Sequence, residues 1–137
     1  MTKHALSSHR FGPDSPEALA SEALGRALGV ALRPRRLVLA DGTSLEVEGL
    51  DDDSTVVAQF VLNEGAVRSA LRNKIAADLF KLVWVASTVV PGARPVLCVS
   101  PTVASILARR GWLPAAARDL GVALYVVTAP DGVKALE

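Results

Sequence analysis

The sequence predicts a single α/β domain with a mixed central sheet flanked by helices. Three observations support this fold class. Helical periodicity occurs near the N-terminus and again in the middle of the chain. Three strand-like segments joined by short turns lie between these two predicted helices. Two continuous apolar segments, typical of buried strands, follow the second predicted helix. A chain of 137 residues with 50% hydrophobic content can form one hydrophobic core and is too short for two ordinary domains. We therefore expect the order helix, three strands, helix, strand, helix, strand.

The first predicted helix lies within residues 13–29. Ser15 is a suitable N-cap, and Pro16 suits the first helical position because its missing N–H would be unpaired there in any case. Gly29 can adopt the left-handed conformation that ends many helices.

The chain ends are expected to lie outside the compact domain. Residues 1–13 are polar and end in Gly-Pro, which indicates a flexible N-terminal arm. Residues 14–130 would then form the domain, and residues 131–137 a C-terminal tail.

Three strand-like segments follow the first helix, at residues 35–40, 44–49 and 54–62. Asp41-Gly42 between the first two is a strong hairpin signal. The connections are too short to contain a crossover helix, so the three strands should form an antiparallel meander.

The longest helical pattern covers residues 66–86. Its apolar stripe consists of Val67, Leu71, Ile75, Leu79 and Leu82. The remaining elements are a buried strand at 94–100, helical segments at 101–111 and 113–121, and a last buried strand at 122–129.

Charge and composition exclude several classes of protein. Lys and Arg number 15 against 14 Asp and Glu, so no global field favours nucleic acid or an anionic membrane. No apolar run is long enough for a spanning helix or a signal peptide, and a cytoplasmic location is expected. Cys98 lies in an apolar run, which indicates a buried thiol without a redox or metal role.

The predicted order and the segment 47–85, VEGLDDDSTVVAQFVLNEGAVRSALRNKIAADLFKLVWV, resemble the PD-(D/E)xK nuclease-like superfamily, whose fold is called restriction-endonuclease-like. In such bacterial proteins an acid-x-lysine strand leads through glycine into a helix with lysine, aspartate and Lys-Leu. The corresponding residues here are Lys74, Asp78, Lys81 and Leu82. The resemblance covers about residues 15–127 and implies an αβββαβ core with a mixed central sheet flanked by helices.

The resemblance also implies where a nuclease site would lie. The family holds a divalent metal with an acid on the second strand and an acid-x-lysine motif on the third. Glu48 falls at the first acid, Gln59 at the second and Val61 at the lysine. Glutamine carries no charge and valine cannot stabilise an anion, so we expect a degenerate member that has lost catalysis and has no cofactor.

Residual metal binding and activity remain alternatives. Glu46 and Glu48 could be metal ligands, or they could be two exposed acids on a solvated strand. An active metal-dependent DNA or RNA nuclease would need Mg²⁺ and a displaced lysine, for which Lys74 is the candidate. Against this, Lys74, Asp78 and Lys81 are spaced to pair with one another on one helix face.

Other charged groups suggest weaker functions. The acidic run at residues 51–53 is expected to be a solvated turn. Candidate nucleic-acid contacts are Arg68, Arg72 and Lys74, and any such binding should be weak. Arg109 and Arg110, with Arg118 nearby, could also contact phosphates, although most such arginines are surface charge.

One arc of the central helix suggests a partner. It is formed by Ser69, Ala70, Asn73, Ala76, Ala77, Phe80 and Trp84, small residues bordered by aromatics. Ala70, Asn73, Ala77, Phe80 and Trp84 are the expected interface. Either the first helix covers this arc, or a protein partner does, with a homodimer the commonest arrangement. In a third interpretation, the former nuclease cleft is filled by apolar side chains around Val61 and the domain is a scaffold.

Overall fold

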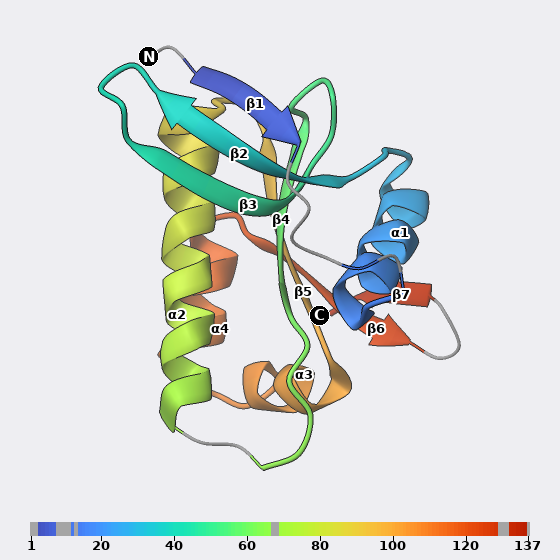
Figure 1. The fold of residues 1–137 in the computed structure, drawn as a ribbon. Helices are drawn as coiled ribbons and strands as arrows, with labels where there is room; N and C mark the ends of the chain where they lie inside the picture. The colour runs from blue at the N-terminus through green and yellow to red at the C-terminus, as the bar shows by residue number, and fades with distance from the viewer. Residues whose placement is uncertain (1–2, 8–11, 13, 67–68, 129–131, 137) are drawn as a thin grey trace.

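The computed structural model describes residues 3–7, 12, 14–66, 69–128 and 132–136. Within these residues the chain forms a seven-stranded mixed sheet in the order β1-β2-β3-β4-β5-β6-β7, with helices on both faces (Figure 1). The strands β1 to β4 are antiparallel neighbours, β4, β5 and β6 are parallel, and β7 is antiparallel to β6. The expected α/β class and mixed sheet are therefore confirmed.

The elements follow the chain in the predicted order, with additions. The strands are β1 Lys3–Ser7, β2 Arg33–Leu39, β3 Ser44–Leu50, β4 Val56–Val61, β5 Arg94–Val99, β6 Ala123–Thr128 and β7 Gly132–Ala135. The helices are α1 Pro16–Leu28, α2 Ser69–Trp84, α3 Pro101–Leu107 and α4 Trp112–Asp119. A π-helical turn, Val85–Val89, extends α2.

Local signals place the ends of these elements. The Ser15 hydroxyl accepts a hydrogen bond from Ala18 N at 3.1 Å and caps α1, and Gly29 ends the helix with φ of 73°. At the hairpin between β2 and β3, Asp41 Oδ1 accepts from Thr43 N at 2.9 Å and Gly42 has φ of 89°. The predicted cap and hairpin are thus confirmed.

Two apolar clusters cover the two faces of the sheet. On one face, α1 packs its Ala20 and Leu24 against Val56, Ala58 and Phe60 of β4 and neighbouring residues of β5. On the other face, the predicted stripe of α2 packs against β4, β5 and β6 together with α3 and α4; its described members are Leu71, Ile75, Leu79 and Leu82, and Val67 lies outside the described residues. The helices α1 and α2 therefore lie on opposite sides of the sheet (Figure 1).

The chain ends differ from the expectation. Lys3–Ser7, expected in a flexible arm, pairs with β2, and Gly132–Ala135, expected in a tail, pairs with β6. Neither segment has the alternation of a long strand, and each is placed by a neighbouring strand edge that is available only in the folded domain.

The acidic turn between β3 and β4 is not simply solvated, as the sequence had suggested. Asp51 is buried, and its Oδ1 accepts from Thr55 N at 2.7 Å and Val56 N at 2.9 Å, while Oδ2 accepts from the Thr55 hydroxyl. Burial alone would raise the pKa of the Asp51 carboxyl, but these hydrogen bonds together outweigh burial and hold its pKa below the ordinary value. Asp52 forms an ion pair with Arg35.

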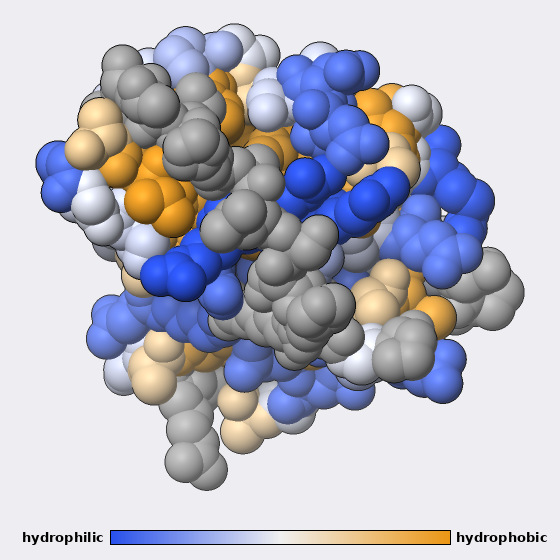
Figure 2. All heavy atoms as spheres, turned by 45° about the horizontal axis from the view of Figure 1, so that its top comes forward, coloured by the Kyte–Doolittle hydropathy of each residue, from blue (hydrophilic) through white to orange (hydrophobic). Residues whose placement is uncertain are grey.

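The surface is mixed in polarity. In the view of Figure 2, the apolar residues that are coloured emerge in several separated patches between hydrophilic ones. No helix in the described part of the chain is long and apolar enough to cross a membrane.

Replacing Asp51 with alanine should lower the free energy of unfolding by about 1–3 kcal/mol at pH 7, because Thr55 N and Val56 N lose their acceptor. The folded-state pKa of Asp51 lies below 3.8. This stabilisation is therefore complete above pH 3.8 and disappears as the pH falls through the folded-state pKa. Urea unfolding of wild type and Asp51→Ala across that range should show the difference shrinking.

The exposed Asp53 of the same turn provides the control. Asp53→Ala should change stability by less than about 0.5 kcal/mol. An equal loss in both variants would show that the hydrogen bonds of Asp51 contribute nothing specific.

Candidate functional site

The candidate site lies where β3 and β4 diverge. These strands pair only at Gly49 with Ala58 and at Leu50 with Val57, and from there β3 runs across the sheet with β1 and β2 (Figure 1). On the other edge of β3, Val47 pairs with Arg35 of β2 and Leu50 pairs with Arg33. β3 therefore has one more residue than β2 between these two pairs, which is a β-bulge. A Cβ on Gly49 would lie 3.3 Å from Ala58 Cβ, so glycine permits the close approach of the two strands.

Glu48 and Gln59 bridge the gap that this divergence leaves. Glu48 N donates to Gln59 Oε1 at 2.8 Å, and Phe60 N donates to Glu48 Oε1 at 2.8 Å. Both side chains are buried. They therefore replace the backbone hydrogen bonds that a regular ladder would form here, which satisfies donors that water cannot reach.

The network continues from Gln59 to α2. Gln59 Nε2 donates to Asp78 Oδ1 at 3.3 Å, and Asp78 Oδ2 lies 3.4 Å from Lys74 Nζ. Asp78 is buried, whereas the Lys74 side chain is 47% exposed. The structure thus brings together Glu48, Gln59, Lys74 and Asp78, all named in the sequence analysis, and shows that Asp78 connects Lys74 to Gln59.

Lys81 does not join this network. Its Nζ donates to the backbone carbonyl of Glu46 at 2.8 Å. The expectation that Lys74, Asp78 and Lys81 pair with one another is therefore correct for Lys74 and Asp78 and wrong for Lys81. The Lys81 side chain instead ties the end of α2 to β3, on the side of the bulge where β3 has left β4.

Val61 occupies an apolar environment. It is fully buried in the same cluster as Val57, Leu97 and Val99. A lysine at this position would place an ammonium group in the core without a charged partner, which is costly. The position that the resemblance assigns to a catalytic lysine is therefore filled by hydrophobic packing.

The oxygen atoms of the network are engaged by protein donors. Gln59 Oε1, Glu48 Oε1 and both carboxylate oxygens of Asp78 accept hydrogen bonds from the protein. Among the residues that the structure describes, no group of three or more His, Cys, Asp and Glu side chains is placed to hold a metal.

The residues expected as metal ligands and those expected as nucleic-acid contacts differ in exposure. Glu46 is half-buried and Glu48 buried, so the pair is not an exposed acidic face. Arg72 and Lys74 are exposed on α2 and remain accessible to a polyanion. Arg68 lies outside the described residues. The Cys98 thiol is buried, as expected, and burial raises its pKa to about 12.

The expected interface on α2 is partly exposed. Ala70, Asn73 and Ala77 are exposed, and Phe80 is 80% exposed. Trp84 is half-buried and packs against the core, so it contributes less than predicted. Ala76 of the same arc is also half-buried and packs against the core. Because α1 packs on the opposite face of the sheet, it does not cover this face of α2.

Comparisons with known proteins give no family for this chain. It matches no protein-family model and no curated protein.

Replacing Gln59 with leucine should destabilise the fold by roughly 1–3 kcal/mol for each buried group left unpaired, namely Glu48 N and Asp78 Oδ1. The double variant Gln59→Leu/Asp78→Leu should recover part of this loss, since it removes both members of one hydrogen bond. Urea unfolding of the wild type, both single variants and the double variant measures the coupling. Strictly additive losses would show that the 3.3 Å contact makes no contribution.

Proposed function

We propose that this chain is a non-catalytic domain of the PD-(D/E)xK nuclease-like type, needing no cofactor, which acts by self-association or by binding a protein partner and retains weak nucleic-acid binding. The arrangement of the former catalytic positions carries this proposal. Gln59 is hydrogen-bonded on both sides, to Glu48 N and to Asp78, and Val61 is part of the core. The groups that would hold a metal and activate water are used to hold the sheet together.

The topology supports the same proposal. A helix precedes a three-strand antiparallel meander, and α2 then connects β4 to its parallel neighbour β5. Glu48 and Gln59 lie side by side on the second and third strands of the meander, which is the placement that the resemblance implies for two metal ligands. Because fold does not determine function, the proposal depends on the chemistry of these positions.

One observation favours the alternative of an active nuclease with a displaced lysine. Lys74 Nζ lies 3.4 Å from Asp78 Oδ2, and Asp78 contacts Gln59. A cation is therefore close to the family position, although it is paired with Asp78. In this alternative, Glu48 and Asp78 would release their present donors to bind a metal.

Wild-type protein should not cleave duplex or single-stranded DNA in the presence of Mg²⁺ or Mn²⁺. Two charged groups of the family pattern are missing, and each such loss costs about 10²- to 10³-fold in rate. Cleavage measured on labelled substrates, with EDTA as a blank, tests this directly.

Lys74→Ala is the informative variant because its partly exposed side chain can be removed without opening the core. Metal-dependent cleavage by the wild type that disappears in Lys74→Ala would overturn the proposal and establish the displaced-lysine enzyme. Arg72→Ala, an exposed cation on the same helix, controls for general loss of DNA affinity.

Self-association should occur through the exposed face formed by Ala70, Asn73, Ala77 and Phe80, hereafter the α2 face. Its small side chains permit close approach, and Phe80 offers a large apolar surface to water. Light scattering should return twice the 14.3 kDa monomer mass at micromolar concentration. Ala77→Lys should return the monomer mass with unchanged circular dichroism, because a buried charge in a twofold interface would face its own copy.

Ala27→Lys supplies a matched control, since Ala27 is exposed on α1 on the other side of the sheet. It should leave the mass unchanged. A monomeric wild type would contradict self-association and leave binding to a different protein as the mode of action.

A further inference from the structure

A hollow of about 300 Å³ lies between α2 and the connection from α3 to α4. Ile106 and Leu113, which belong to the apolar core, form part of its wall. The rest of the lining includes three cations and one large aromatic ring, supplied by Arg72 of α2 and by Arg109, Arg110 and Trp112 of the connection and the start of α4.

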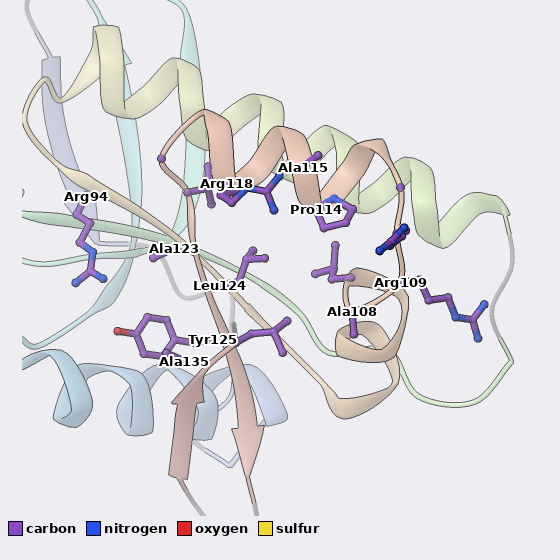
Figure 3. Close-up of a pocket in the computed structure, with 16 residues that line it drawn as sticks. Arg94, Ala108, Arg109, Pro114, Ala115, Arg118, Ala123, Leu124, Tyr125 and Ala135 are labelled. Carbon is purple, nitrogen blue, oxygen red and sulfur yellow. The ribbon is translucent and has the colours of Figure 1, made fainter.

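A larger hollow of about 810 Å³ shares part of this connection and lies between α4, the end of α3 and β6. Its arginines are Arg94, Arg109, Arg110 and Arg118. Arg94 and Arg109 lie at opposite ends of it, and Arg109 extends outward, away from Arg94 and Tyr125 (Figure 3). The larger hollow therefore does not bring its cations to one point, whereas the smaller hollow places Arg109 and Arg110 around one opening with Trp112.

The cations of the smaller hollow are suited to a polyanion. All three arginines are exposed, and none of the lining residues is acidic. Within the described ranges of the chain, no ion pair joins any of the three to an acidic side chain. Water and salt screen each exposed cation, so a single small anion gains little there. A chain of linked phosphates gains more, because each contact releases a counterion.

Trp112 offers a flat apolar surface beside these cations. Its side chain is 71% exposed. Its backbone is held in place, because α4 begins at Trp112 and the next residue, Leu113, is buried in the core. An exposed indole of this kind is a platform on which an unpaired base can stack. The bases of a duplex already stack on one another, so the ring favours a single strand.

The start of α4 adds to the positive potential. Gly111 is the N-cap and has no side chain that could accept a hydrogen bond from the first N–H groups of the helix. A Cβ at Gly111 would meet no atom within 4 Å, so the backbone is open on this side. N–H groups at a helix N-terminus favour phosphate, and here they lie next to the exposed arginines.

We propose that this hollow binds single-stranded nucleic acid, with a base stacked on Trp112 and phosphates against Arg72, Arg109 and Arg110. The inference rests on the nucleic-acid binding in the proposed function and names its strand type and its surface. It retains Arg72 from the contacts expected from the sequence and leaves out Lys74, whose ammonium pairs with Asp78. The ring and the cations favour nucleic acid over an acidic peptide, because each nucleotide repeats both a phosphate and a flat base.

Fluorescence anisotropy of labelled oligothymidylate and oligouridylate of about 15 nucleotides, with the full chain in EDTA, measures this binding. At about 50 mM salt both strands should bind more tightly than a duplex of the same length, and their ratio shows whether DNA or RNA is preferred. The slope of log K against log salt should be about −2, because each phosphate contact with a single strand contributes about −0.7.

Two sets of variants locate the site. Arg109→Gln/Arg110→Gln should weaken oligothymidylate binding at least fivefold and reduce the magnitude of the salt slope by about 1. Trp112→Leu should also weaken binding at least fivefold, whereas Trp112→Phe should stay within about twofold of wild type, since a phenyl ring still stacks. These side chains are exposed, so thermal unfolding temperatures should change by no more than a few degrees.

The matched control is Arg33→Gln/Arg36→Gln, which removes the same charge from exposed positions on β2. It should leave binding within twofold. Equal weakening in both arginine double variants would show non-specific attraction and overturn the proposal.

Other outcomes separate this proposal from the proposed function. Binding that no variant weakens would overturn this site and leave the weak nucleic-acid binding of the proposed function in place, whereas a wild type that binds no oligonucleotide would overturn both. A duplex that binds as tightly as a single strand, or a Trp112→Leu variant that binds like wild type, would show that no base stacks here. An oligoglutamate that displaces oligothymidylate at equal charge would assign the surface to acidic peptides.

Discussion

Two hydrogen bonds between side chain and backbone join the two halves of the sheet. β3 must leave β4 after two paired positions, because its bulge turns it toward β2, and this leaves the N–H groups of Glu48 and Phe60 buried without ladder partners. Gln59 and Glu48 each supply one acceptor. Leaving a buried donor unpaired costs about 1–3 kcal/mol of folding free energy, which is a large share of the net stability of a small domain. The antiparallel meander and the parallel half thus share one sheet through two backbone-paired positions and these two side chains.

This constraint explains the chemistry of the site. A metal-dependent hydrolytic site needs side chains that hold the metal and a water that the metal activates. Here the amide of Gln59 both accepts and donates, which a carboxylate could not do, and so it connects Glu48 N to Asp78. Lys74 balances the buried Asp78 carboxylate from the solvent side. Neutral glutamine is thus the better structural residue at a position where an acid would leave two carboxylates in contact.

The polar network and the arginine-lined hollow between α4, α3 and β6 differ in burial. In the network, Glu48, Gln59 and Asp78 are buried and hydrogen-bonded within the protein. Arg94, Arg109, Arg110 and Arg118 line the hollow and are exposed. Salt screens exposed charges, whereas buried polar groups must find partners inside the protein. Burial therefore decides which polar groups the fold has to pair.

The sequence by itself determined the elements whose signals are local. The Ser15 cap, the Asp41-Gly42 hairpin and the apolar stripe of α2 each depend on residues a few positions apart, and the structure contains all three among its described residues. The tertiary structure alone decided contacts between distant segments. Gln59 and Asp78 are 19 positions apart, and β1 and β7 are placed by neighbouring strand edges. Arg94 and Arg118 line the same hollow because β5, β6 and α4 pack together. Periodicity reports which face of an element is apolar, but it does not report which polar groups the packing of those faces will bring together.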